Sequence, residues 1–174
     1  MIILVPALAV IAYVGFSLLS GQVSNRDLPE SRPPGKDIYS FDDARMLDDI
    51  KSSTAKYLAS IQNDYAIEAL IVTLPSLPPS HTIESLAAEM FSNWQIGSTT
   101  GGRGLLLLLS DQEKLIKIEV SYELEDVFTD IFCGYIEYKQ LKGYFLSNQV
   151  DIGLIAVMEE IEQRAQLKHQ ADYT

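Results

Sequence analysis

Acidic side chains are the most plentiful groups in this sequence that could do chemistry, and several of them are closely spaced. Glu123, Glu125, Asp126 and Asp130 fall within eight residues, directly after a predicted strand, and Asp42 opens a predicted helix. Carboxylates gathered at strand ends could hold calcium, a hard cation that prefers oxygen ligands, or transfer protons during phosphate-ester hydrolysis. The alternative is a solvated face of residues at helix N-termini, which the helix dipole favours.

Other catalytic arrangements need residue types that the chain lacks or spaces poorly. The sequence has two histidines, His81 and His169, and one cysteine, Cys133. Neither histidine has a partner spacing typical of a Ser-His-Asp or Cys-His site. Cys133 follows Ile131 and Phe132, which predicts a buried core thiol. A single cysteine also excludes an internal disulfide framework and a multi-cysteine metal site. We therefore expect no cofactor, with weakly bound Ca²⁺ as the alternative.

The glycine-rich segment 97–104 reads Gly-Ser-Thr-Thr-Gly-Gly-Arg-Gly. It lacks the Gly-Lys-Ser/Thr ending and the G-x-G-x-x-G spacing of nucleotide-binding loops. It also follows a predicted helix and precedes a predicted strand, whereas phosphate-binding loops lead from a strand into a helix. The segment is therefore predicted to be a flexible surface loop near a site.

The overall composition limits the classes of function. The chain has 174 residues, 13 Lys and Arg against 24 Asp and Glu, and a formal net charge of −11. It contains no basic run, so it is a poor ligand for nucleic acid, which needs clustered Lys and Arg. With 47% apolar and 21% charged residues, wholesale disorder is not expected. The length suits one domain with an appendage.

The N-terminal stretch 2–19 is apolar and carries no charged side chain. As a helix it would be about 27 Å long, which is close to the hydrocarbon thickness of a bilayer. We therefore predict a single-pass transmembrane anchor at 1–20. A cleaved secretory signal peptide is the main alternative, but the positive n-region is missing and the apolar run is long. A helix buried in the soluble domain is the third possibility. A polar linker at 21–37, rich in Pro, Ser and Gly, precedes a globular domain at 38–174.

Hydrophobic periodicity and capping residues predict the elements of that domain. Ser40 with Asp43 resembles a capping box, and Thr82 is a predicted N-cap. The third helical pattern is expected to break at Gly134 and Gly143. Strand, helix and second strand should form a right-handed parallel unit, with the third strand antiparallel. The fold class is therefore α/β, a three-layer α/β/α sandwich on a small mixed sheet. Helices are predicted over 42–63, 83–94, 124–147 and 149–170, and strands over 69–73, 105–109 and 115–120.

In the order Trp94–Gly97, glycine loop, Ile118–Glu125 and Thr129–Asp130, the short motifs of this sequence resemble the TPM domain, a family named from a thylakoid-lumen protein, a photosystem II protein and a nematode receptor modulator. The family pattern is roughly W-G-I-G, a loop ending in Asp-x-Gly, an apolar strand, G-Y-G-L-E and then L-T-D. The resemblance covers about 38–165. Its matching segments are Asp42–Leu47, Val72–Leu77, Trp94–Gly97, the glycine loop and the leucines after Gly104, Ile118–Glu125, Thr129–Asp130, Tyr144–Phe145 and Gly153–Leu154.

Family members are small, usually exported and membrane-tethered α/β/α sandwiches. Weak acid phosphatase activity and calcium binding are attributed to some, and others accompany membrane complexes. Here the loop aspartate is replaced by Gly102, and the two glycines of G-Y-G-L-E are Ser121 and Glu123. Arg103 adds a cation that would repel calcium, and a lost glycine would reshape any position that needs a positive φ. The resemblance therefore implies a domain that kept its fold while its site eroded.

The resemblance favours a non-catalytic, membrane-anchored accessory subunit or assembly factor of a larger membrane protein complex, photosynthetic or respiratory. Its partners would be that complex, through the N-terminal helix and the soluble domain, and the lipid bilayer. The alternatives are a low-activity acid phosphatase using Asp42, Glu125 and Asp130, or a calcium-binding module with those acids as weak ligands. The family implies a periplasmic or otherwise extracytoplasmic domain. Arg26, Arg32 and Lys36, which follow the anchor, favour the cytoplasm by the positive-inside rule.

Overall fold

The computed structural model describes Arg32 and residues 39–172. The predicted anchor at 1–20 lies outside the described residues, and so does the linker at 21–37 apart from Arg32. Among the residues that are described, no helix combines the length and the hydrophobicity that crossing a bilayer would require.

A four-stranded mixed sheet forms the centre of the domain, with its strands in the order β1-β2-β3-β4. The parallel pairing of β2 with β3 and the antiparallel pairing of β3 with β4 confirm the prediction, and β1 adds an unpredicted parallel strand beside β2. The last two strands are joined by a short turn at 111–114. The strands are β1 (Ser40–Asp42), β2 (Glu68–Leu74), β3 (Gly104–Ser110) and β4 (Leu115–Val120).

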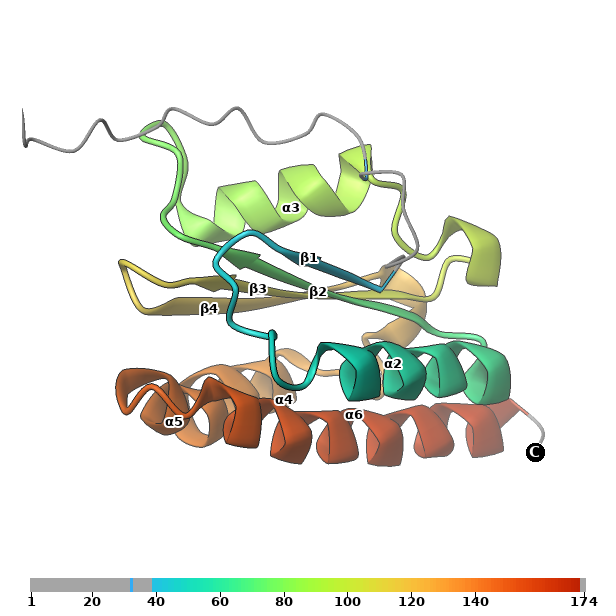
Figure 1. Cartoon of the computed structure of the whole chain (residues 1–174). Helices are drawn as coiled ribbons and strands as arrows, with labels where there is room; N and C mark the ends of the chain where they lie inside the picture. Colours follow the sequence, from blue (N-terminus) through green and yellow to red (C-terminus); the bar gives the residue numbers. More distant parts are fainter. Residues whose placement is uncertain (1–31, 33–38, 173–174) are drawn as a thin grey trace, which may run out of the picture.

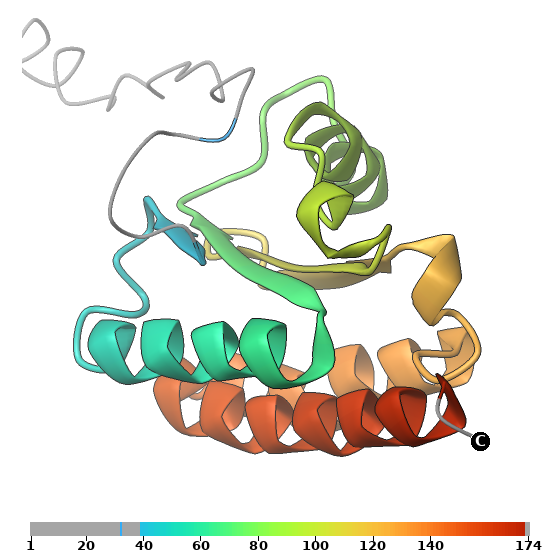
Figure 2. The same ribbon diagram turned by 90° about the vertical axis from the view of Figure 1, so that its right-hand side faces the viewer.

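Helices cover both faces of the sheet, so the predicted three-layer arrangement is confirmed (Figure 1). Of the α-helices in the described residues, α3 lies on one face and the others lie on the opposite face (Figures 1 and 2). The α-helices are α2 (Lys51–Tyr65), α3 (Ile83–Asn93), α4 (Asp130–Tyr135), α5 (Lys142–Leu146) and α6 (Val150–Asp172). Shorter segments are the 3₁₀ turns η1 (Ser98–Thr100) and η2 (Tyr122–Leu124) and the π-helical η3 (Ile136–Leu141).

The leucine run of β3 explains why two helical layers are needed. Leu105, Leu107 and Leu109 join the core beneath α2, α4 and α6, whereas Leu106 and Leu108 join the core beneath α3. Side chains alternate across a strand, so a continuous apolar run must be covered on both sides.

The start of the first helix was wrongly predicted. Residues 40–42 form the strand β1, and α2 begins only at Lys51, after Ile50, which makes no side-chain capping bond. The chain turns between them because the carboxylate of Asp42 accepts hydrogen bonds from the backbone N–H of Met46 and of Leu47, at 2.9 and 3.0 Å. The Ser40–Asp43 capping box is therefore absent, and the apolar spacing reflects burial of loop residues.

Helices α3 and α6 agree with the predicted bounds to within two residues, whereas the helix predicted over 124–147 begins only at Asp130. Thr82 caps α3, and its side chain forms a capping box with Ser85. The helical run from 130 to 146 continues through Gly134 and Gly143, where an added Cβ would meet no atom within 4 Å. The expected breaks are therefore wrong. The irregularity is the π-helical η3 between the two glycines, which hydrophobic periodicity does not reveal.

Candidate functional site

The two ends of the strands form two separate edges of the sheet. We call the edge at the C-terminal ends of β1, β2 and β3 the turn edge, and the opposite edge, where β2 and β3 begin and β4 ends, the loop edge. Asp42 pairs in register with Thr73 near the turn edge, and Glu68 pairs with Gly104 at the loop edge. Five residue steps along β2 separate the two pairs, which amounts to roughly 16 Å.

The acids predicted to form a site do not come together. Asp42 ends β1 at the turn edge, whereas Glu125 and Asp130 follow β4 at the loop edge. Besides its two backbone bonds, Asp42 accepts a hydrogen bond from the hydroxyl of the fully buried Thr73. Its carboxylate thus shapes the turn after β1. In the described part of the chain, no group of three or more His, Cys, Asp or Glu residues is arranged to hold a metal ion.

Glu125 and Asp130 are both exposed to solvent. Glu125 directly follows η2, and Asp130 is the first residue of α4. The N-cap is Thr129, whose hydroxyl accepts a hydrogen bond from the N–H of Phe132 at 3.3 Å. A negative charge at this position is favourable because it faces the positive end of the helix dipole.

Two glycines close the glycine loop against the sheet. Gly97 has φ +91°, and a Cβ on it would lie 2.6 Å from the backbone N of Gly104. A Cβ on Gly104 would lie 2.5 Å from the carbonyl oxygen of Ile96. Within the loop, the hydroxyl of Thr100 donates to the carbonyl of Arg103 at 2.7 Å. The loop is therefore a tightly packed turn whose shape depends on backbone contact.

A buried acid that the sequence analysis missed lies beside this loop. Glu68, at the start of β2, is only 5% exposed. One carboxylate oxygen accepts a hydrogen bond from the N–H of Gly97 at 2.8 Å, and the other pairs with the guanidinium of Arg32. The charged partner is what makes burial of this carboxylate tolerable. The sequence signal that could have indicated this buried acid is the position of Glu68 directly before the apolar run 69–72.

The positions where this chain departs from the family pattern lie next to one another. Ser121 has φ −73°, so no positive φ is needed there, and its hydroxyl accepts a hydrogen bond from the N–H of Gly104 at 3.0 Å. A Cβ on Gly102 would lie 3.3 Å from Cγ of Glu123. The segment after β4 therefore places the acidic side chain of Glu123 beside Gly102, the loop position where the family pattern has an aspartate. Arg103 is paired with Asp172 at 2.6 Å.

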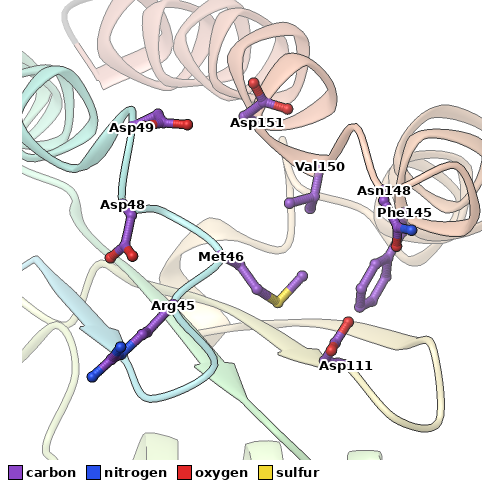
Figure 3. A pocket seen from close by; sticks show the side chains of 9 residues that line it. All are labelled: Arg45, Met46, Asp48, Asp49, Asp111, Phe145, Asn148, Val150 and Asp151. Carbon is purple, nitrogen blue, oxygen red and sulfur yellow. The ribbon is translucent and has the colours of Figure 1, made fainter.

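The turn edge carries a pocket of about 360 Å³ between the loop before α2 and the start of α6 (Figure 3). Four aspartates give it a negative character, although Asp111 is paired with Lys114 at 2.5 Å. Asp48 and Asp49 belong to the loop before α2, Asp111 to the turn after β3 and Asp151 to α6, and the four carboxylates do not converge on a common point (Figure 3). The lining residues are Arg45, Met46, Asp48, Asp49, Asp111, Phe145, Asn148, Val150 and Asp151.

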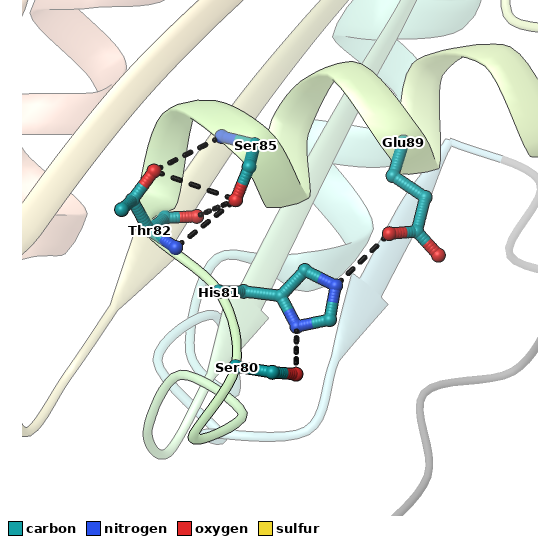
Figure 4. A network of polar contacts seen from close by, with 5 residues as sticks. All are labelled: Ser80, His81, Thr82, Ser85 and Glu89. Atoms are coloured by element: carbon teal, nitrogen blue, oxygen red, sulfur yellow. Dashed lines mark hydrogen bonds and ion pairs between the residues drawn. The ribbon is translucent and has the colours of Figure 1, made fainter.

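His81 has partners, contrary to the prediction from its spacing. Its Nδ1 lies 3.0 Å from the hydroxyl of Ser80, and its Nε2 lies 2.9 Å from a carboxylate oxygen of Glu89 (Figure 4). The N–H of His81 donates to Pro78, and the N–H of Thr82 donates to Ser85. These two neighbouring N–H groups are therefore not available to stabilise an oxyanion. The contacts hold the loop before α3 against the N-cap and the second turn of the helix.

Cys133 is a buried thiol, as predicted. Its Sγ lies 3.7 Å from the carbonyl oxygen of Phe128. Burial, followed by the nearby charge of Glu137, raises the pKa of the thiol to about 11. A thiol in this state is a poor nucleophile at neutral pH.

Comparison with known proteins gives the family. The family model described as the TPM domain matches residues 40–164. A solution NMR structure of the N-terminal domain of a protein from P. gingivalis resembles this fold with a TM-score of 0.62 and 23% sequence identity, over 69% of this chain and 76% of that chain. At this identity the likeness shows the fold alone. A search of the curated proteins found no match. The extent of the family match shows that the chain belongs to the TPM domain family.

Proposed function

We propose that this chain is a non-catalytic accessory subunit or assembly factor of a larger membrane protein complex. The N-terminal apolar segment would anchor it, and the TPM domain would lie outside the cytoplasm. The observation that carries the proposal is the separation of Asp42 from Glu125 and Asp130 by the length of the sheet. Carboxylates at opposite ends of the strands cannot act together on one phosphate ester or ligate one calcium ion.

The loop edge supports the same conclusion. Gly102 supplies no carboxylate, and Arg103 introduces a guanidinium that is paired with Asp172. Glu68 already has a charged partner in Arg32 and a hydrogen bond from Gly97. Membership of the TPM family supports an extracytoplasmic location.

An assay of phosphomonoester hydrolysis tests the non-catalytic part of the proposal. The full chain, reconstituted in lipid nanodiscs, should hydrolyse p-nitrophenyl phosphate no faster than empty nanodiscs at acidic pH, with or without calcium. Asp130→Asn should leave this background unchanged. Robust turnover that Asp130→Asn abolishes would instead establish the acid phosphatase.

Calcium titration tests the third candidate, a calcium-binding module. Any binding should be weaker than about millimolar, because a competent site needs several oxygens within coordinating distance of one ion. The melting temperature of the full chain should therefore not rise at micromolar calcium, since only a ligand that exceeds its Kd stabilises the folded state. A saturable rise that Asp130→Asn removes would show that other oxygens complete a site.

Location and partnership need tests in the membrane. Protease added outside the cytoplasmic membrane of cells with a permeabilised outer layer should cleave within the linker at 21–37. Protection from outside together with cleavage from the cytoplasmic side would reverse the orientation. After extraction in mild detergent, the chain should co-purify with the subunits of a membrane complex. Migration as a single isolated species would contradict a stable subunit role.

A further inference from the structure

Large apolar side chains lie exposed along one side of α4 and η3. Ile131 is 87% exposed, Tyr135 50% and Tyr138 68%. They alternate along the segment with buried residues, so they lie on the side that faces away from the core. We call these residues the α4 face. Single exposed apolar residues are ordinary, but a contiguous set of large ones is typical of a site of interaction.

The opposite side of the same segment explains why the α4 face points outward. Phe132, Cys133 and Ile136 are buried in the core. Glu137 is also buried, and its carboxylate accepts a hydrogen bond from the N–H of Ile118 at 2.7 Å. Ile118 belongs to β4, an edge strand whose outward N–H groups need partners. The bond to Glu137 and the core contacts together fix the orientation of the helix, so the α4 face is held on the surface.

Negative charge borders the N-terminal end of the α4 face, and Lys139 places one positive charge beside Tyr138 at the other end. The chain passes from the end of β4 through η2 and down to α4 on one side of the molecule (Figure 2). Glu123, Glu125 and Asp130 are exposed along this path, and within the described residues none of their carboxylates makes an ion pair or hydrogen bond. Asp126, in contrast, pairs with Lys168 at 2.8 Å. A partner that covers the apolar residues would therefore meet uncompensated carboxylates at the rim.

We infer that the α4 face is a docking surface for a basic amphipathic helix of a partner protein. The apolar side of such a helix would cover Ile131, Tyr135 and Tyr138, and its Lys or Arg side chains would reach Glu125 and Asp130. An anionic membrane surface is disfavoured because these carboxylates would repel its headgroups. A second copy is disfavoured because the three carboxylates bordering each face outnumber the positive charge of Lys139. The inference deepens the proposed function by giving the accessory domain its contact surface.

Binding of a defined probe tests the inference. The probe is a short synthetic peptide of Leu and Lys patterned as an amphipathic helix, and its counterpart has Glu in place of each Lys. Both are titrated onto the full chain in zwitterionic nanodiscs, with empty nanodiscs as the blank. The Lys peptide should bind and the Glu peptide should not. The double variant Ile131→Glu with Tyr138→Glu should weaken binding of the Lys peptide at least about tenfold, because it replaces two of the three apolar side chains of the contact with charged ones.

Two further variants distinguish binding at this surface from non-specific binding of the peptide to exposed apolar residues. The charge reversal Glu125→Lys with Asp130→Lys should weaken binding of the Lys peptide and strengthen binding of the Glu peptide. The control is Ile155→Glu, which alters a residue of α6 that is 46% exposed, and it should leave both affinities unchanged. All the altered side chains are on the surface, and circular dichroism should show the same fold for each variant.

Several results would overturn the inference. The first two are an equal loss of affinity for the Lys peptide in Ile155→Glu and in the α4-face variant, and equal affinity of the natural chain for the two peptides. The other two are tighter binding to anionic vesicles than to the Lys peptide, and self-association of the chain that the α4-face variant abolishes. The phosphatase assay reports separately on the proposed function. If the chain binds the Lys peptide and also hydrolyses the phosphate ester, the docking surface stands and the non-catalytic role is rejected. If the chain co-purifies with a membrane complex but does not bind the peptide, only the docking surface is rejected.

Discussion

At the loop edge of the sheet, two glycines let separate backbone segments touch, whereas at the turn edge one carboxylate holds the chain in place. Gly97 and Gly104 leave no room for a Cβ, and the loop between them is closed by its own hydrogen bonds. Asp42 instead organises the turn edge by accepting three hydrogen bonds, beside a pocket that is open to solvent. Acidic residues at both edges therefore have different surroundings, although they look alike in the sequence.

The largest expected effect is at the loop edge, from Gly97→Ala. The new methyl group would lie 2.6 Å from a backbone nitrogen, at a φ of +91° that alanine avoids. Overpacking and backbone strain should together lower the free energy of unfolding by about 3 kcal/mol. Urea denaturation of the full chain measures this change.

Gly143→Ala is the matched control for that substitution. Gly143 lies inside α5, and an added Cβ would meet no atom within 4 Å. Alanine there should be neutral or stabilise the fold by up to about 1 kcal/mol, because glycine is a poor helix former. If both substitutions had the same small effect, the loop edge would not depend on backbone contact.

At the turn edge, Asp42→Ala should lower the free energy of unfolding by about 2 kcal/mol. The substitution removes three hydrogen bonds and leaves the hydroxyl of the buried Thr73 without its acceptor. Asp48→Ala is the control, because Asp48 is an exposed residue of the same loop and should change stability by less than about 0.5 kcal/mol. Equal effects in thermal or urea unfolding would contradict a structural role for Asp42.

The ion pair at the loop edge should matter less. Arg103 and Asp172 are 2.6 Å apart, but their side chains are 25% and 31% exposed. Arg103→Ala should therefore cost about 0.5 kcal/mol at low ionic strength. The difference from the unsubstituted chain should shrink when salt is added, because salt screens exposed charges. A loss of several kcal/mol that salt does not change would mean that Arg103 acts through packing.

The smallest expected contribution to stability at neutral pH comes from ionisation of the Cys133 thiol, which lies in α4. The unfolded thiol ionises near pH 8.5, roughly as a free cysteine does, and the folded thiol near pH 11. The unfolded state therefore holds fewer protons in this interval. The contribution to stability is complete below about pH 8.5 and is lost as the pH rises through 11. Unfolding measured between pH 8 and 11 should show a steeper fall for the natural chain than for Cys133→Ala. Parallel curves would contradict burial of the thiol.

Much of the fold was predictable because its signals are local. The leucine run at 105–109 needs cover on both faces, Thr82 is a capping residue, and the alternation at 115–120 marks a half-buried strand. The candidate site was less predictable. Glu123, Glu125 and Asp130 follow β4 in sequence and stay at one edge, but nothing in their spacing reveals that Asp42 is at the other.

The sequence by itself determined the family, the helical layers and the buried state of Cys133, because motif order and hydrophobic periodicity act over short distances along the chain. The tertiary structure alone decided the pairing of Glu68 with Arg32, of His81 with Glu89 and of Glu137 with the backbone of Ile118, whose members lie 8 to 36 residues apart along the chain. It also decided that β1 joins the sheet, since three residues form a strand only when a neighbouring strand supplies their hydrogen bonds. Contacts between residues far apart in the sequence depend on how the helices and strands pack, and the spacing of residues along the chain does not predict that packing.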